Sequence, residues 1–318
     1  MLIENMYNYC VDISWRIYMP LFLRNSNKLV RISEKPFRIE KESQTLLESN
    51  LPQVLGLTFV RSEFSVKNRR IDSLAFDEQK KSFVILEFKR DKSSSVVDQG
   101  AAYLGLILNN RADFILEINE ILGRKYKRDN IDWSQTRVIL VAAKFSDIQK
   151  EAVDSDILGV GIELLEVHQY ENKLYSFDFI RKTKNLGNKK IKKHSKFNKI
   201  VKELKEYTEE QHLEKASDKM FSLYEELKST ILNIDSSIEV VPLKKYISFK
   251  SGSSLCAVVV YKQHLTLALN AKWGSLDDSK KLFRNVSDIG HWGGGEYMLK
   301  ITDSKNLEYI ASVIKQMI

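Results

Sequence analysis

The most informative part of the chain is residues 69–103, which read RRIDSLAFDEQKKSFVILEFKRDKSSSVVDQGAAY. Two runs within it, Arg70–Phe76 and Ser82–Lys89, are rich in Ile, Val, Leu and Phe and predict adjacent strands. Each run is interrupted by one carboxylate, Asp72 in the first and Glu87 in the second. Burying an acid in an apolar strand is costly unless its charge is compensated, so this pair marks a candidate site.

Lys89 follows Glu87 by two residues, so both side chains point to the same face of a strand. Carboxylates on neighbouring strands are ligands that Mg²⁺ accepts, and the backbone carbonyl of Phe88 is a further candidate ligand. An ammonium group beside such an ion can orient an attacking water and offset negative charge on a phosphate. The alternative interpretation is an ion-pair network with a purely structural role.

The next predicted element is a helix over Val96–Asn109, which follows a polar stretch able to cap it. Gln99 and Tyr103 are four residues apart and therefore share one face of this helix. On that face they could support Lys89, the attacking water or a phosphate. We therefore include both residues in the candidate catalytic set.

A helix is also predicted before the strands, over Lys41–Leu55, because its apolar residues recur with helical spacing. Pro52 is expected to break or kink it. Glu42 and Glu48 lie on this helix, and either could add a carboxylate to the metal site. We favour Glu48 as the additional ligand.

The order Glu, Asp, Glu-x-Lys and Gln-x-x-x-Tyr on α, β, β and α elements closely resembles the RecB-like branch of the PD-(D/E)xK nuclease superfamily. The similarity covers roughly residues 37–180 and includes the neighbours of the key residues. These neighbours are Arg69-Arg70-Ile71-Asp72, Ile85-Leu86-Glu87-Phe88-Lys89-Arg90 and Asp98-Gln99-Gly100-Ala101-Ala102-Tyr103. One departure from the family pattern is Ile71, which stands in the place of the name-giving proline.

This resemblance implies an α/β, restriction-endonuclease-like core in which a mixed central sheet is flanked by helices. Asp72, Glu87 and Lys89 would be its metal and catalytic residues, with Gln99 and Tyr103 in support. The implied activity is that of a Mg²⁺-dependent deoxyribonuclease, more an endonuclease than an exonuclease, in which Mn²⁺ can substitute. Restriction, repair and defence are the roles typical of relatives, and a homodimer is a candidate state because two strand cuts often need two sites.

The remaining periodicities predict a two-domain chain. The N-terminal half is expected to add strands over Leu57–Val66, Arg137–Ala143, Ile162–His168 and Leu174–Ile180, and helices over Asp113–Leu122 and Ser146–Val153. We expect a nuclease-like domain over residues 1–180, a basic linker and helix over 181–215, and a smaller α+β domain over 216–318. The last is expected to contain helices over Lys219–Leu232 and from Lys305, and strands over Ile238–Val241, Tyr246–Phe249, Leu255–Tyr261, His264–Leu269 and Tyr297–Ile301.

The second half resembles an uncharacterised domain that is often found behind nuclease domains of this branch and is sometimes labelled a predicted transport protein. Tyr246-Ile247-Ser248-Phe249-Lys250 and Gly290-His291-Trp292-Gly293-Gly294-Gly295-Glu296-Tyr297 carry that resemblance. It implies no mechanism. Trp292 could stack on a base, but a tight turn whose ring packs on the core is the interpretation that we prefer.

The formal net charge of +8 is concentrated in one place. Residues 181–205 contain eleven Lys or Arg and a single acid, Glu203, so this segment carries a net charge of +10 and the rest of the chain −2. Such a stretch suits a polyanion, because each neutralised phosphate releases counterions. Nucleic acid, and DNA in particular, is therefore the expected partner, although a solvated linker explains the charge equally well. The candidate contact residues are Lys189, Lys190, Lys192 and Lys193.

Other sequence features narrow the class of protein. No stretch approaches the roughly 20 apolar residues of a membrane span, and Cys10 and Cys256 lack disulfide or zinc spacing, so we expect a cytoplasmic protein with no membrane partner. Both cysteines are expected to be small buried residues. Two other functions stay open: a DNA-binding protein without turnover, and a regulatory protein whose C-terminal domain senses a ligand or partner.

Overall fold

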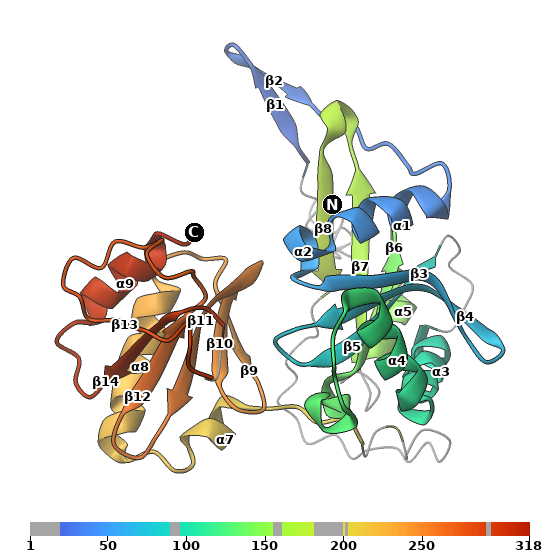
Figure 1. Ribbon diagram of the computed structural model, residues 1–318. Coiled ribbons are helices and arrows are strands. Elements are labelled where there is room, and N and C mark those ends of the chain that lie inside the picture. Colours follow the sequence, from blue (N-terminus) through green and yellow to red (C-terminus); the bar gives the residue numbers. More distant parts are fainter. Residues whose placement is uncertain (1–19, 90–95, 155–160, 181–199, 201–202, 291–293) are drawn as a thin grey trace, which may run out of the picture.

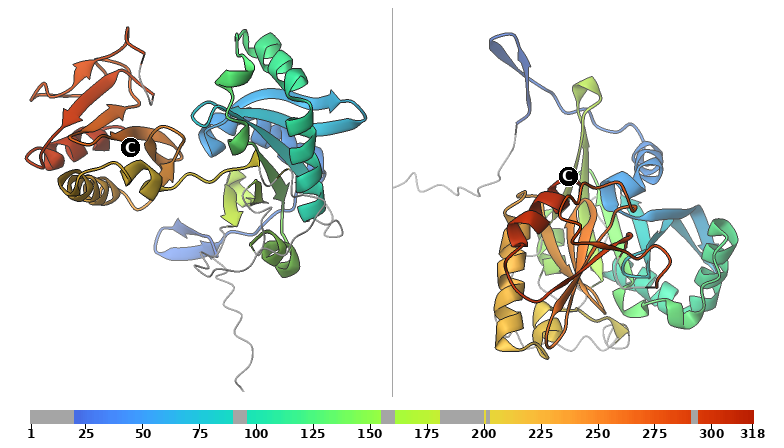
Figure 2. Two further views of the ribbon diagram at one scale, coloured as in Figure 1. Left: turned by 90° about the horizontal axis from the view of Figure 1, so that it is seen from below. Right: turned by 60° about the vertical axis from the view of Figure 1, so that its left-hand side comes forward.

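The structure is a computed structural model of the 318-residue chain and describes residues 20–89, 96–154, 161–180, 200, 203–290 and 294–318. Two lobes are visible, each built on a six-stranded sheet (Figures 1 and 2). The first sheet has the order β3-β4-β5-β6-β7-β8 and is mixed, whereas the second is antiparallel with the order β13-β14-β12-β11-β10-β9. The expected fold class is therefore confirmed.

The first sheet begins as an antiparallel meander and continues with parallel strands. Its strands are β3 (Thr58–Val66), β4 (Arg69–Asp77), β5 (Ser82–Lys89), β6 (Arg137–Ala142), β7 (Ile162–Gln169) and β8 (Tyr175–Ile180). The pairs β5–β6 and β6–β7 are parallel, and β8 returns antiparallel to β7. β5 and β6 are almost entirely buried, which explains their continuous apolar sequences.

Helices cover both faces of this sheet. One face carries α1 (Glu40–Ser49) and α2 (Leu51–Leu55), whose Leu47 and Leu51 pack with Leu86 and Phe88. The other face carries α3 (Val96–Asn109), α4 (Arg111–Leu122) and α5 (Asp147–Asp154), together with the short turns η1 (Arg128–Asn130) and η2 (Trp133–Gln135). Pro52 lies in the first turn of α2, so the predicted break in the first helix is confirmed.

A two-stranded ribbon, β1 (Phe22–Asn25) and β2 (Lys28–Arg31), stands out from the N-terminal lobe (Figure 1). It was not expected from the sequence. All eight strand residues are exposed. The chain after it is tied to the end of β7 by a bridge between Glu34 and Tyr170, next to the turn η4 (Glu171–Lys173).

The C-terminal lobe is an antiparallel sheet with helices on one face (Figure 2). Its strands are β9 (Glu239–Pro242), β10 (Ile247–Ser251), β11 (Ser253–Val260), β12 (Leu265–Leu269), β13 (Arg284–Asn285) and β14 (Tyr297–Ile301). Its helices are α7 (Glu209–Leu213), α8 (Asp218–Leu232) and α9 (Leu307–Lys315). Only the short α7 and β13 were not expected, because elements of five and two residues leave little periodicity.

The described end of the basic segment packs on the N-terminal lobe. Leu204 is buried in the core of that lobe, and the Tyr207 hydroxyl donates to Asp132 at 3.0 Å. The C-terminal lobe reaches the same end of the first sheet, where the Tyr246 hydroxyl lies 3.5 Å from the carbonyl oxygen of Gln79. Lys189, Lys190, Lys192 and Lys193 lie outside the described residues, as do Cys10 and Trp292.

Trp133 and Cys256 both contribute to packing, and the burial of Cys256 confirms the expectation from the sequence. Trp133 acts as a packing anchor, because its ring stacks on Phe83 at 5.6 Å and the Arg111 guanidinium lies 5.1 Å above it. Cys256 is a buried small residue, 1% exposed, and burial raises the pKa of its thiol. None of the helices in the described part of the chain combines the length and apolar character that crossing a bilayer requires.

Candidate metal and catalytic site

The site begins where strands β4 and β5 separate. Their pairing runs from Asp77 opposite Ser82 to Ser73 opposite Leu86. One residue further, a carboxylate oxygen of Asp72 accepts a hydrogen bond from the backbone N–H of Phe88 at 2.9 Å. The side chain of Asp72 is thus held between the two strands, at the point where the backbone ladder has ended.

Glu87 is at the centre of the site and is only 5% exposed. Its Oε1 atom lies 3.1 Å from Nζ of Lys89 and 2.9 Å from Nε2 of Gln99. The ammonium is on the same strand and the amide is on α3, so the sheet and the helix meet at this carboxylate. The structure therefore brings Gln99 of the predicted helix to the Glu87–Lys89 pair that the strand spacing grouped.

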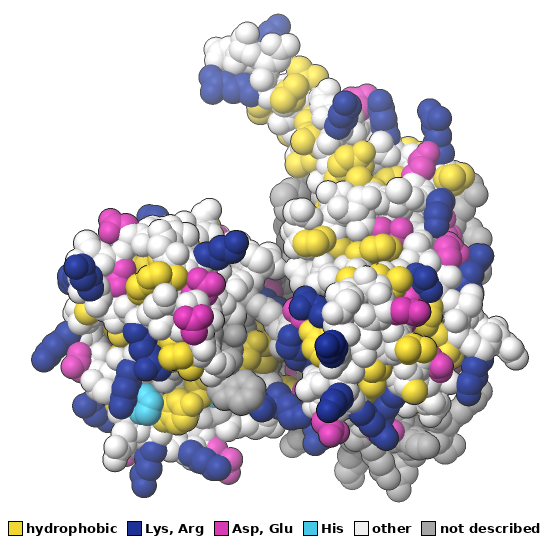
Figure 3. Space-filling view, viewed as in Figure 1, with side chains coloured by type: hydrophobic (Ala, Val, Ile, Leu, Met, Phe, Trp, Pro, Cys, Tyr) yellow, Lys and Arg dark blue, Asp and Glu magenta, His cyan; other side chains and the backbone are white. Residues whose placement is uncertain are grey.

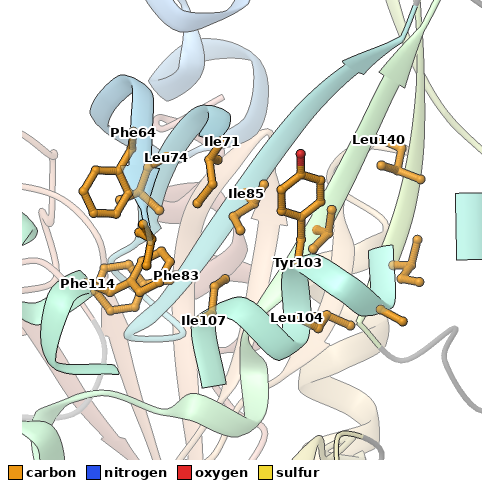
Figure 4. Close-up of a cluster of buried hydrophobic side chains, with 14 of the residues drawn as sticks. Phe64, Ile71, Leu74, Phe83, Ile85, Tyr103, Leu104, Ile107, Phe114 and Leu140 are labelled. Carbon is orange, nitrogen blue, oxygen red and sulfur yellow. The ribbon is translucent and has the colours of Figure 1, made fainter. Parts of the chain in front are cut away.

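Tyr103 stands one turn beyond Gln99 on α3. Its ring packs in the buried cluster beneath the sheet, whereas its hydroxyl points away from that cluster (Figure 4) and lies 3.4 Å from the carbonyl oxygen of Arg70. Burial, and then the negative charge of nearby Glu87, raise the pKa of Tyr103 far above its usual value. The side chain is therefore a neutral phenol that can only donate or accept hydrogen bonds at ordinary pH.

The two carboxylates are electrostatically strained. Burial raises the pKa of Asp72, although the hydrogen bond from Phe88 and the charge of Lys89 oppose the shift. Burial and then the charge of Asp72 raise the pKa of Glu87, with Tyr103 and Lys89 acting in the other direction. The half-buried Asp72 and the buried Glu87 both have raised pKa values, so the site lacks part of the positive charge that would let both acids ionise.

The donor set fits a divalent cation. Oε2 of Glu87 and Oε1 of Gln99 are both buried and have no hydrogen-bond partner among the described residues. Buried acceptors without partners are rare in native proteins, and oxygen atoms are the ligands that Mg²⁺ prefers. The described part of the chain holds no group of three or more His, Cys, Asp or Glu side chains arranged for a metal ion. Asp72 and Glu87 are therefore the side-chain carboxylates that could bind the ion at this site.

Glu48 is placed differently from the expectation that it joins these two acids. Its Oε1 accepts hydrogen bonds from the hydroxyl of Ser73 at 2.5 Å and from Nε2 of Gln44 at 2.9 Å. Ser73 follows Asp72 directly, so in a strand the two side chains point to opposite faces. Glu48 thus lies on the face that α1 covers, and we leave it out of the ligand set. The backbone N–H of Phe88 donates a hydrogen bond to Asp72. The metal-binding role of the Phe88 carbonyl stays a prediction.

Two residues at the site were missed by the sequence reasoning. Gln44 is 4% exposed and donates to the backbone oxygen of Asp72 at 2.8 Å, which fixes that residue from α1. Its position on the apolar stripe of the helix, three residues before Leu47, was the available signal. Glu63 is close enough to raise the pKa of Asp72, and it is itself paired with Lys41 at 3.0 Å. A positive φ of 54° at Glu63 could not be predicted from its residue type.

These features define a class: a two-domain α/β protein whose N-terminal sheet carries a half-buried Asp, a buried Glu and an adjacent Lys at the point where two strands separate. The chain is 42% identical over 303 residues to an uncharacterized protein of Haemophilus influenzae, a match that covers 94% of this chain and 99% of that protein. The chain belongs to the same family as that protein. Within it, residues 209–316 match a domain of unknown function, DUF5655.

Solved structures are similar only at a low level. A repair endonuclease from Pyrococcus abyssi is 23% identical with a TM-score of 0.27, and an EndoMS-dsDNA2 complex is 19% identical with a TM-score of 0.27. SfsA of Pyrococcus furiosus in complex with Ca²⁺ is 15% identical with a TM-score of 0.24. They cover 42%, 43% and 50% of this chain, and 50%, 50% and 92% of their own chains, so this chain spans about half the length of the two endonuclease structures.

Proposed function

We propose that the chain is a Mg²⁺-dependent nuclease that hydrolyses phosphodiester bonds of DNA, with its active site at Asp72, Glu87 and Lys89. The observation that carries the proposal is the pair of half-buried Asp72 and buried Glu87 at the end of the β4–β5 ladder. Among the described residues Oε2 of Glu87 has no hydrogen-bond partner, and Lys89 lies 3.1 Å from its other carboxylate oxygen. A structural ion-pair network would normally satisfy that oxygen.

Each residue has a defined task in this proposal. Asp72 and Glu87 would hold the divalent ion, which when bound would neutralise phosphate charge and promote attack by water. Lys89, with its side chain 22% exposed, is positioned to hydrogen-bond a water or a non-bridging phosphate oxygen. Gln99 fixes the carboxylate of Glu87, and Tyr103 offers a neutral hydroxyl beside it.

The test is cleavage of DNA by the purified chain in Mg²⁺ and, separately, in Mn²⁺ or EDTA. Supercoiled plasmid and end-labelled linear duplex distinguish internal cutting from digestion from an end, and a matched RNA tests the preference for DNA. We expect cutting that needs the metal and that falls at least a hundredfold in Lys89→Ala and Glu87→Gln.

Lys150→Ala is the matched control for Lys89→Ala. Lys150 is also a half-buried lysine in an ion pair of the same lobe, 2.8 Å from Glu166, but it belongs to α5. Its loss should leave the cutting rate unchanged. Equal cutting by wild type, Lys89→Ala and Glu87→Gln would refute the proposed site. Binding to DNA that falls with salt, ignores Mg²⁺ and gives no product would instead support a binding protein without turnover.

We further propose that the basic segment 181–205 contributes phosphate contacts through Lys189, Lys190, Lys192 and Lys193. Its net charge of +10 is the support for this proposal. Replacing these four lysines by Gln should weaken duplex binding for all sequences alike. The slope of log K against log salt should become shallower by about one for each lysine that binds a phosphate. An unchanged slope would show that the segment is a solvated linker.

A further inference from the structure

Part of the second sheet is open to solvent on the face opposite its helices. Helices α8 and α9 lie on one face (Figure 2), where Val258 and Leu267 belong to the buried core. Their neighbours Val259 and Thr266, which are paired across β11 and β12, point the other way because side chains alternate along a strand. There they line a hollow of about 580 Å³. In Figure 3 apolar side chains and Lys or Arg side chains lie together on the lower part of the C-terminal lobe.

Two aromatic rings stand at one end of this hollow. Tyr261 and His264 close the turn between β11 and β12, where the backbone N–H of Tyr261 donates to the carbonyl oxygen of His264 at 2.9 Å. Their rings stack with centroids 4.7 Å apart and 17° between the planes. Tyr261 is nevertheless 43% exposed, so part of its ring stays accessible to a further planar group. A ring in such a position can stack on a nucleic-acid base, because every base has a flat π face.

The charge around the hollow is positive. None of the residues that line it in the described part of the chain is an acid. Arg284 of β13 lines it and has no acidic partner among the described residues; its Nη2 lies 3.1 Å from the sulfur of Met298, a weak acceptor. Lys300 stands opposite Thr266 in β14, and burial and then the charge of Lys300 lower the pKa of His264. The hollow therefore offers positive charge that a phosphate can neutralise.

The rings and the arginine are spread over several strands. From β12, which begins beside His264, the sheet order crosses β14 to reach β13 and Arg284, a span of about 10 Å. Along the strands Arg284 is level with Ala268, four residues or about 13 Å beyond His264. A strand of several nucleotides can therefore put one base on the rings and a later phosphate beside Arg284.

We propose that this face of the second sheet binds single-stranded nucleic acid, with a base stacked on Tyr261 and a phosphate held by Arg284. Exposed rings beside cations, in a hollow without an acid, form the pattern by which proteins hold single strands without reading their sequence. The domain of unknown function would then supply a nucleic-acid site of its own. Its residues are separate from the proposed active site and from the basic segment, so the inference does not depend on the proposed cutting activity.

Fluorescence anisotropy of the full chain with a labelled oligothymidylate of about 12 nucleotides tests the proposal. EDTA in the buffer prevents metal-dependent cutting during the measurement. Tyr261→Ala and Arg284→Gln should each weaken binding about tenfold, through the loss of one stacked base or one phosphate contact, whereas Tyr261→Phe keeps the ring and should bind like wild type. Phe221→Ala and Lys219→Gln are the matched controls, because both residues are exposed on α8, which covers the other face. Both controls should also bind like wild type.

Photocrosslinking locates the contact within the full chain. A strand that carries 5-iodouracil should crosslink to the tryptic peptide 251–262, which contains Tyr261. Crosslinks confined to other peptides would overturn the proposal, as would binding that neither Tyr261→Ala nor Arg284→Gln weakens relative to its control. Thymidine monophosphate that binds this face as tightly as the strand would overturn it too, because the site would then hold a free nucleotide. A chain that binds the strand here and cuts no DNA would count against the proposed function alone.

Discussion

The lobes built on the two six-stranded sheets differ in whether their buried polar side chains are hydrogen-bonded. Every buried side-chain polar atom without a hydrogen-bond partner in the described part of the chain lies between Glu63 and Arg137, in the N-terminal lobe. In the C-terminal lobe the buried polar side chains are Ser248 and Ser254, whose hydroxyls lie 3.1 Å apart. Oε2 of Glu63, Oε1 of Glu117 and Nε of Arg137 are in ion pairs, but the remaining atoms, such as Oε2 of Glu87, are not. Unpaired buried groups reduce stability, so the N-terminal lobe tolerates a cost that the C-terminal lobe avoids.

Asp278 in the C-terminal lobe and Asp72 in the N-terminal lobe show the same contrast. Burial alone would raise the pKa of Asp278, but the backbone N–H of Phe283 and the hydroxyl of Tyr309 outweigh it and lower that pKa. Asp72 receives a single backbone N–H and its pKa is raised. Asp278 is thus a satisfied structural acid, whereas Asp72 is left in need of positive charge. This contrast is consistent with the proposed site in the N-terminal lobe.

The largest expected effect is on the cutting rate of Asp72→Asn. The neutral amide cannot supply the negative charge that holds a divalent ion, and we expect a loss of about a thousandfold, roughly 4 kcal/mol of transition-state stabilisation. Single-turnover cleavage at saturating Mg²⁺ measures it. Asp113→Asn, an exposed acid of α4, removes the same charge and should leave the rate unchanged. Equal losses in the two variants would mean that net charge matters more than the site.

The next effect is on stability and separates the two lobes. Leu267 is fully buried in the second sheet and Leu140 in the first. Each change to Ala should cost about 2–5 kcal/mol of the free energy of unfolding. Leu267→Ala should leave DNA cutting intact below the melting transition. Leu140→Ala, in β6 next to β5, should lower both the stability and the cutting rate. Calorimetry and cleavage at low temperature test this, and a loss of cutting in folded Leu267→Ala would show that the C-terminal lobe takes part in chemistry.

A smaller effect concerns pH. The folded state raises the pKa of Glu87, so the contribution of this group to stability is fully present below its unfolded-state pKa and is lost as the pH rises through the raised pKa. In EDTA, Glu87→Gln should therefore melt a few degrees higher than wild type at pH 7, and the difference should vanish near pH 4. Mg²⁺ should raise the melting temperature of wild type but not of the variant. A variant that melts lower at pH 7 would indicate that Glu87 is a stabilising ion-pair partner.

The smallest expected effect is on the stability of the C-terminal lobe. The Ser217 hydroxyl caps α8 by accepting a hydrogen bond from the backbone N–H of Met220 at 3.4 Å. Ser217→Ala should cost about 1 kcal/mol and leave DNA cutting unchanged. Thermal unfolding monitored by circular dichroism measures the cost. No change in stability would mean that the long hydrogen bond contributes little.

The sequence predicted most of the elements because their apolar periods are strong. The strands around Asp72 and Glu87 and the helix of Gln99 and Tyr103 were expected within a few residues of their observed bounds. The ribbon at Phe22–Arg31 was not, since its strands are four residues long and exposed on both faces, which leaves no pattern of burial to recognise. Glu48 was misplaced because a helix position does not reveal which face of the sheet the helix covers.

By itself the sequence determined the grouping of Glu87, Lys89, Gln99 and Tyr103. Two residues along a strand, or four along a helix, share a face whatever the rest of the chain does. Only the tertiary structure decided that the strand and the helix meet at Glu87, that Asp72 enters the gap where β4 leaves β5, and that Glu48 binds Ser73 instead. Those contacts join residues far apart in the chain, and their geometry depends on where the backbone ladder ends and which face each helix covers.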